Sequence, residues 1–199
     1  MPEIKQAKVV ILATNGFEQS ELLVPLQKLR DAGAHVDVVS PERGEIRGWK
    51  DKDWGESVSV DKSLDEANAD DYDAIVLPGG QINPDLLRVN QGALQFIRSF
   101  LDAGKVVAAI CHAPWLLVEL DAVRDRNVTS YKSIKTDVIN AGGKWTDREV
   151  VTDRGVITSR NPGDLNAFCA KVIEEIQEGS HSRPRGARTS KPEQRPGAH

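Results

Sequence analysis

The chain has 199 residues, a formal net charge of -4 and two cysteines. This length suits one domain with its own core, and the slightly acidic balance argues against nucleic acid as the main partner, because phosphate binding needs a clustered basic surface. No apolar run approaches the roughly 18 residues that cross a bilayer, and no basic segment followed by an apolar stretch opens the chain. We therefore expect a cytoplasmic protein without a membrane segment, in which Cys111 and Cys169 are both reduced.

The first part of the chain has the pattern of a βαβ unit. Residues 8–14 contain a continuous apolar run, which is typical of a parallel strand covered on both faces. A helix is predicted from Phe17 with leucines at helical spacing, and it ends at Gly33 before a second strand over residues 35–40. Residues 41–62 combine glycine breakers with alternating polarity, which favours short hairpin strands.

The alternation of strand and helix continues through the rest of the chain. Further strands are predicted over residues 74–77, 106–110, 149–152 and 156–159, the last two as a hairpin. Further helices are predicted from about residue 83 and over residues 93–101, 114–120, 134–141 and 164–177, the last with Cys169 on its apolar stripe. Such alternation predicts an α/β fold, a flavodoxin-like three-layer sandwich with a mainly parallel sheet.

The composition changes near the end of the chain. Residues 179–199 are rich in Ser, Pro, Gly, Arg and Lys and contain hardly any apolar residue. Such a segment cannot bury enough surface to offset its ordering entropy, so we expect a disordered basic tail in contact with solvent. Residues 1–178 then form the single folded domain.

Ligands of open α/β sheets gather at the carboxyl ends of the strands, and the predicted strand over residues 106–110 delivers Cys111 to that edge. A helix with Pro114 in its first turn follows at once, which is the arrangement of a nucleophile elbow. Backbone amides and the helix dipole there predict a lowered thiol pKa. The structural alternative is a small buried cysteine. His112 is the one histidine placed to assist, although adjacent side chains leave an elbow in different directions.

Two other loops at this edge supply the remaining candidates. Glu18 either complements the start of the first helix or points at the sulfur, in which case it would be protonated or would share its proton with the thiol. Gly79 and Gly80 form an ordinary turn, or their amides stabilise an oxyanion together with that of His112. Asp85 follows Asn-Pro and has helix capping as its default role.

Several segments together resemble the ThiJ/PfpI superfamily, specifically its PfpI branch of intracellular proteases and general stress proteins, whose fold is like that of class I glutamine amidotransferases. The similar stretches are NGFEQSELLVPLQKLRDAG, YDAIVLPGG, VVAAICHAPW, VTSYKSIKTDVINAGGKWTDREVV and TSRNPGDLNAF. The resemblance implies Cys111 as nucleophile, His112 as its partner and Glu18 in contact with the sulfur. It also implies that Asp85 reaches the histidine of a neighbouring subunit, and hence a homodimer or a higher homo-oligomer.

The resemblance is compatible with several activities that share thiolate attack on a carbonyl carbon. Our first hypothesis is a stress-response enzyme of the glyoxalase III or deglycase type, which acts on methylglyoxal, glyoxal or early glycation adducts of proteins through a hemithioacetal or hemithioaminal. The alternatives are an intracellular cysteine peptidase and a non-catalytic redox sensor or chaperone in which Cys111 is oxidised. None of these needs a cofactor, and we expect no metal site, because Cys111, His112 and Glu18 lack further ligands nearby.

Overall fold

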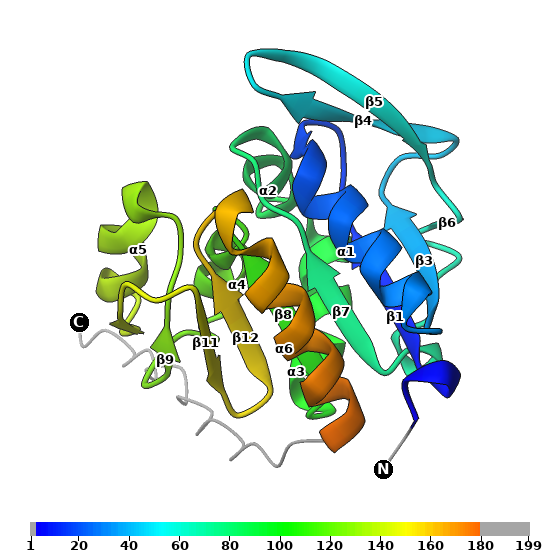
Figure 1. The fold of residues 1–199 in the computed structure, drawn as a ribbon. Coiled ribbons are helices and arrows are strands. Elements are labelled where there is room, and N and C mark those ends of the chain that lie inside the picture. The colour runs from blue at the N-terminus through cyan, green and yellow to red at the C-terminus, as the bar shows by residue number, and fades with distance from the viewer. Residues whose placement is uncertain (1–2, 180–199) are drawn as a thin grey trace, which may run out of the picture.

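The computed structural model describes residues 3–179 and contains a central seven-stranded sheet (Figure 1). The strands lie in the order β11-β12-β8-β7-β1-β3-β6, and every neighbouring pair is parallel except β11 with β12. Their bounds are β1 Lys8–Leu12, β3 His35–Ser40, β6 Lys62–Ser63, β7 Ala74–Leu77, β8 Val106–Ile110, β11 Val150–Asp153 and β12 Val156–Ser159. The predicted mainly parallel sheet with a terminal hairpin is confirmed.

Helices cover both faces of this sheet and complete the predicted three layers (Figure 1). Helices α1 and α6 pack side by side on one face, α3 and α4 cover the other, and α2 and α5 both contact α4. The bounds are α1 Gln19–Asp31, α2 Ile82–Leu87, α3 Gln91–Asp102, α4 Pro114–Glu119, α5 Lys135–Asn140 and α6 Leu165–Glu178. Short 3-10 helices lie at η1 Ile4–Gln6, η2 Ala69–Asp71, η3 Lys132–Ile134 and η4 Pro162–Asp164.

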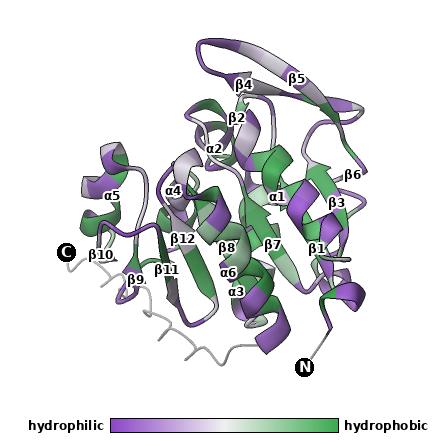
Figure 2. Cartoon of the chain, viewed as in Figure 1, coloured by the Kyte–Doolittle hydropathy of each residue, from purple (hydrophilic) through white to green (hydrophobic). Residues whose placement is uncertain are grey.

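The core consists of two apolar layers, one on each face of the sheet. Strand β1 shows the division, because Val9 and Ile11 face α1 and α6 whereas Val10 and Leu12 face α3, and all four are fully buried. Figure 2 shows the hydrophobic residues concentrated along the central strands. Cys169 of α6 lies in the first of these layers and is 2% exposed, so its prediction as a core residue is confirmed.

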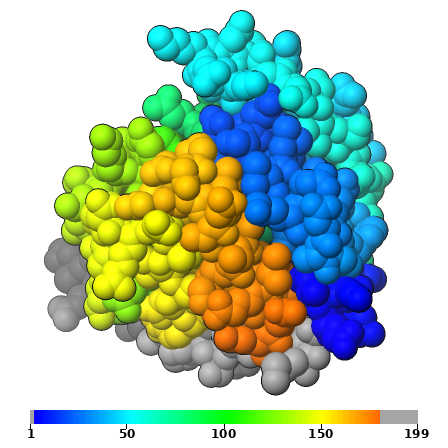
Figure 3. All heavy atoms as spheres, viewed as in Figure 1, coloured from blue at the N-terminus to red at the C-terminus, as the bar shows by residue number. Residues whose placement is uncertain are grey.

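The predicted hairpin in the first half of the chain forms a separate small sheet. Strands β4 (Glu45–Lys50) and β5 (Asp53–Ser59) pair antiparallel, and β2 (Phe17–Glu18) adds to β4. This hairpin stands out from the body of the molecule (Figure 3). Because Phe17 and Glu18 pair with β4, helix α1 begins two residues later than predicted. The two tryptophans of the hairpin pack edge to face, with ring centroids 5.5 Å apart.

The remaining short strands, β9 (Asn127–Val128) and β10 (Lys144–Trp145), pair parallel to each other beside the main sheet. Gly179 closes α6 with a φ of 91°. Residues 180–199, which make up nearly all of the predicted tail, lie outside the described residues. Within residues 3–179, no helix is both long and apolar enough to cross a membrane.

Candidate active site at Cys111

Cys111 occupies a strained turn between β8 and α4. Its φ is 64°, in the left-handed region that residues with a β-carbon rarely adopt. Two backbone hydrogen bonds over-determine this conformation: Cys111 N donates to Ser159 O at 3.0 Å, and Cys111 O accepts from Tyr131 N at 2.8 Å. The predicted nucleophile elbow is therefore confirmed, and it holds a sulfur-bearing residue that is 5% exposed.

The His112 ring is held between the sulfur and a serine. Its Nδ1 lies 3.2 Å from Cys111 Sγ, and its Nε2 lies 3.2 Å from Ser133 Oγ. The ring stacks on Tyr131 at 4.8 Å between centroids and meets Trp115 edge to face at 5.2 Å. Burial lowers the pKa of His112, so the ring is neutral at neutral pH. The adjacent histidine thus does reach the thiol, a point that sequence position alone left open.

The glutamate at the sulfur is Glu21, so the expectation that Glu18 contacts it is wrong. Glu21 lies in the first turn of α1, is fully buried and interacts with the Cys111 thiol, while its Oε2 accepts a 2.8 Å hydrogen bond from Gly79 N. Glu18 is extended in β2, half-buried, and accepts a hydrogen bond from Ser20 Oγ at 3.1 Å. Because α1 starts only at Gln19, the inward-facing position falls one turn later than Glu18.

Burial of Glu21 changes its protonation. Loss of hydration raises the pKa of Glu21 from 4.5 to about 8, against the opposing effect of the Gly79 hydrogen bond, and the nearby Glu18 charge adds to the increase. A group with this pKa is a carboxylic acid at neutral pH. It can therefore donate a proton in the pocket, which an ordinary surface glutamate cannot do.

The Cys111 thiol also has a raised pKa, contrary to the predicted decrease. Burial is the main cause, and the Glu21 carboxylate beside the sulfur is the second, whereas the amides of Gly80 and His112 oppose them. Helix α4 has only six residues, so its dipole does not outweigh burial. Cys111 and Glu21 consequently form a coupled pair that binds protons at neutral pH, and the thiolate must form during reaction, with His112 as the nearest base.

The two glycines of the Pro-Gly-Gly turn have different roles. The Gly79 amide is already bound to Glu21, so the expectation that it stabilises an oxyanion is wrong. A β-carbon on Gly79 would lie 2.5 Å from Glu21 Oε2 and 2.7 Å from the β-carbon of Cys111, so only glycine fits here. The Gly80 amide instead faces the sulfur together with that of His112. These two amides are the donors available to an oxyanion.

Asp85 lies in the first turn of α2 and is exposed. The ring of His112 is engaged by Cys111, Ser133 and two aromatic rings of its own chain, so Asp85 of the same chain is not its partner. Sequence reasoning missed Ser133. Asp85 as a partner across a subunit interface stays a prediction.

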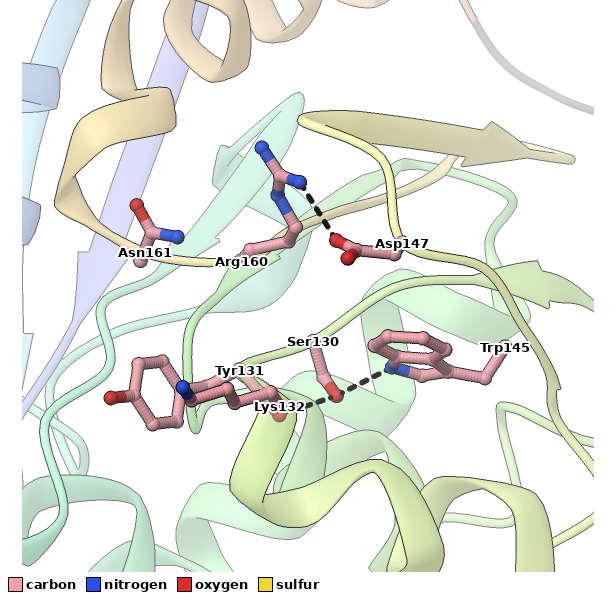
Figure 4. A pocket seen from close by; sticks show the side chains of 7 residues that line it. All are labelled: Ser130, Tyr131, Lys132, Trp145, Asp147, Arg160 and Asn161. Atoms are coloured by element: carbon pink, nitrogen blue, oxygen red, sulfur yellow. Dashed lines mark hydrogen bonds and ion pairs between the residues drawn. The ribbon is translucent and has the colours of Figure 1, made fainter.

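A pocket of about 510 Å³ lies next to two segments that hold the elbow in place (Figure 4). It is lined by residues 130–132, by Trp145 and Asp147, and by residues 160–161. Two of these segments are hydrogen-bonded to the backbone of Cys111, because Tyr131 N donates to Cys111 O and Ser159 O, next to Arg160, accepts from Cys111 N. Across residues 3–179, no three His, Cys, Asp or Glu side chains are grouped in a way that could hold a metal ion.

A comparison with protein families agrees with this geometry. The model of the DJ-1/PfpI family matches residues 7–175, which is most of the chain. The chain belongs to the DJ-1/PfpI family. The resemblance of its motifs to the ThiJ/PfpI superfamily is thereby confirmed.

Relatives within the DJ-1/PfpI family carry two kinds of name. Deglycase PfpI of Pyrococcus furiosus is 42% identical over 170 residues, which cover 85% of this chain and 99% of that protein. The putative cysteine protease YraA of Bacillus subtilis is 39% identical over 162 residues, 81% of this chain and 93% of that protein.

The solved structures agree on the fold. A two-domain protein of Anabaena variabilis, with DJ-1/ThiJ/PfpI-like and ferritin-like domains, matches with a TM-score of 0.81 and 35% identity. The match covers 86% of this chain and 48% of that longer chain. The flavodoxin-like three-layer arrangement is therefore confirmed.

Proposed function

We propose that this protein is a cofactor-independent enzyme that uses Cys111 to convert methylglyoxal, glyoxal or early glycation adducts into lactate or glycolate. The observation that carries the proposal is the buried group at the elbow: the thiol, a neutral imidazole at 3.2 Å and a protonated Glu21. The name of the Pyrococcus deglycase supports it.

The first step is addition of the thiol to the aldehyde. Cys111 Sγ bonds to the aldehyde carbon while its proton passes to His112 Nδ1, whose lowered pKa keeps it free to accept. In this tautomer Ser133 Oγ accepts a hydrogen bond from Nε2–H, so the lone pair of Nδ1 points at the sulfur. The amides of Gly80 and His112 stabilise the negative charge on the carbonyl oxygen until His112 passes the thiol proton to it, which gives a hemithioacetal and leaves the imidazole neutral again.

An amine adduct enters by exchange at the same carbon. The carbon–sulfur bond forms as the carbon–nitrogen bond breaks, and the amine leaves with a proton from Glu21, which is replaced by the proton of the thiol. The product is the same hemithioacetal, with the amine restored. Both kinds of substrate therefore share the later steps.

The hemithioacetal is converted without any oxidant. His112 removes the proton from the carbon bonded to sulfur, and a proton is returned to the neighbouring carbonyl carbon as its oxygen becomes a hydroxyl, which produces a thioester. Water then hydrolyses the thioester to the 2-hydroxy acid and frees the thiol. Methylglyoxal and one water thus give one lactate.

Access to the site favours a small substrate over a peptide. Cys111 and His112 are only 5% and 4% exposed, which restricts the approach of a polypeptide. The low exposure of both residues supports the aldehyde hypothesis over the peptidase alternative.

Lactate production from methylglyoxal, without glutathione or added metal, tests the proposal. The wild type should turn over repeatedly and Cys111→Ser should not. Cys169→Ser should retain activity, because this cysteine is on the buried face of α6. If the wild type makes no lactate but cleaves peptides in a Cys111-dependent manner, the aldehyde hypothesis is wrong and the peptidase hypothesis replaces it.

We also propose that the protein forms a homodimer or a higher homo-oligomer. Ile82, Leu86 and Val89 are 37%, 49% and 74% exposed, at helical spacing along and just after α2. Asp85 belongs to the same exposed surface. Helix α2 lies near the site, because Arg88 at its end lies over the Trp115 ring at 5.1 Å and Trp115 packs against His112.

Sedimentation of wild type and Leu86→Lys tests the assembly. The wild type should sediment as an oligomer that the substitution dissociates, whereas a monomeric wild type would exclude a role for Asp85 of a neighbouring subunit. The cytoplasmic location stays a prediction.

A further inference from the structure

Asn83 is a fully buried polar side chain that the steps above do not use. It lies in the first turn of α2. Its Oδ1 accepts a hydrogen bond from Thr14 N at 2.8 Å. Its Nδ2 donates to Pro78 O at 2.9 Å and to Gly79 O at 3.3 Å. The two donor hydrogens and the oxygen of a carboxamide allow all three bonds. Asn83 therefore joins the end of β1 to the turn that follows β7.

The two carbonyl groups that accept from Asn83 belong to successive peptide groups. A trans peptide group is planar, and its C=O and N–H bonds point in opposite directions. Fixing the Pro78 carbonyl therefore fixes the direction of the Gly79 N–H, which donates to Glu21 Oε2 at 2.8 Å. Fixing the Gly79 carbonyl fixes the direction of the Gly80 N–H, which faces the reacting sulfur. One side chain thus sets the orientation of both amides.

The two glycines do not select this orientation by themselves. Rotation of the peptide group between Gly79 and Gly80 changes ψ of the first residue and φ of the second, and glycine adopts a wide range of both angles. The orientation depends instead on the donors to the Gly79 carbonyl, which are Asn83 Nδ2 and, at 3.2 Å, Glu18 N. After rotation by half a turn, the same peptide group would present its oxygen to the sulfur and would repel an oxyanion.

We propose that Asn83 is a positioning residue for the oxyanion that forms when Cys111 attacks the aldehyde. It acts through the backbone, because its amide holds the Gly80 N–H toward the oxyanion and the Gly79 N–H toward Glu21. Donors that are oriented before the reaction stabilise the charge without rearranging as it forms. The inference rests on the proposed function, since it concerns the charge that develops in the same reaction.

Two uncharged substitutions remove the donor. Asn83→Leu keeps the approximate size of the side chain and Asn83→Ala shortens it, and neither can hydrogen-bond to the turn. Asn90→Ala is the matched control, because Asn90 also accepts a backbone hydrogen bond with its side-chain oxygen, from Ala93 N at 3.0 Å, but at the start of α3. All proteins are assayed at one temperature, at which circular dichroism shows every variant to be folded.

Two rates are measured for each protein: kcat for methylglyoxal, in which an oxyanion forms, and alkylation of Cys111 by iodoacetamide, in which none forms. The Gly80 amide also hydrogen-bonds to the sulfur and lowers the pKa of the thiol, so its loss slows alkylation at neutral pH. In both Asn83 variants kcat should fall about ten- to a hundred-fold, with KM within about three-fold of the wild type. Alkylation should fall about five-fold, as for one net hydrogen bond. Asn90→Ala should leave both rates unchanged.

The two rates separate the positioning role from the chemistry. A fall in kcat that exceeds the fall in alkylation, in both Asn83 variants, supports the proposal. An unchanged kcat, a fall no larger than that in alkylation, or variants that fold at no temperature overturn it, because Asn83 then has no effect specific to the oxyanion. If the wild type makes no lactate, the proposed function itself has failed. Alkylation then decides alone: a slower rate in both variants supports orientation of the Gly80 amide by Asn83, and an unchanged rate overturns it.

Discussion

Replacement of Glu21 by glutamine gives the most quantitative prediction. Gln retains the shape of the side chain and can still accept the hydrogen bond of the Gly79 amide, but it has no ionisable group. In the wild type, the pKa of Glu21 is raised from 4.5 to about 8 by burial. The substitution therefore removes one specific source of pH-dependent stability and leaves the packing largely intact.

The sign follows from proton binding in the two states. Between pH 4.5 and about pH 8, Glu21 is ionised in the unfolded chain but protonated in the folded chain, so its contribution to stability is present at low pH and is lost as pH rises. Over this range the stability of the folded protein falls by about 1.4 kcal/mol for each pH unit, because the two states differ by one bound proton. From pH 5 to pH 7.5 the loss of stability is on the order of 3 kcal/mol.

Urea denaturation of both proteins at pH 5 and pH 7.5 measures this effect. The free energy of unfolding of Glu21→Gln minus that of the wild type should increase by about 3 kcal/mol from pH 5 to pH 7.5, so the variant becomes relatively more stable at the higher pH. The exposed Glu45→Gln is the control and should keep the wild-type pH dependence. A difference that stays constant within about 0.5 kcal/mol would show that Glu21 is not protonated in the folded protein.

Three further predictions concern the same site. Ser133→Ala should lower kcat for methylglyoxal about ten-fold with little change in KM, because the His112 ring loses its hydrogen bond at Nε2, whereas Ser133→Thr should keep kcat near the wild-type value. An unchanged kcat in Ser133→Ala would show that Ser133 has no role in the site. In melting and activity assays, Gly79→Ala should destabilise the protein by about 2 kcal/mol and abolish turnover, because the new β-carbon displaces Glu21. Gly92→Ala should have neither effect, because its β-carbon would approach only one side-chain atom, at 3.3 Å. Activity should rise with pH as His112 loses its proton and fall again near pH 8 as Glu21 ionises, and a flat pH–rate profile would contradict these roles.

The layers of the fold were predictable because each strand and helix has its own local signal. The apolar runs at residues 8–14 and 106–110 predict buried parallel strands, and both strands lie in the central sheet. The sequence points to Glu18 because it follows the first strand directly, whereas the inward position of Glu21 depends on α1 beginning at Gln19, two residues later than predicted. Glu21 lies four residues before Pro25 on the same buried side of α1, and this spacing was the available signal for a buried carboxyl group.

Other features depend on contacts that no local pattern encodes. Ser133 reaches His112 only because β9 and η3 return to the elbow, a tertiary arrangement between residues 21 apart. The direction of the thiol pKa also depended on tertiary structure: the helix start was visible in the sequence, but the burial of the sulfur and of its carboxyl neighbour was not. The pocket likewise combines three distant segments of the chain.

The central claim is that Cys111 forms a covalent bond with the aldehyde-derived carbon during turnover. Rapid mixing with methylglyoxal, acid quenching and peptide mass spectrometry test it directly, with Cys169 in the core as an internal control. The account predicts a transient acyl adduct on the peptide that contains Cys111, absent from Cys111→Ser and from the Cys169 peptide. Lactate formation that continues in Cys111→Ser, with no adduct in the wild type, would contradict it.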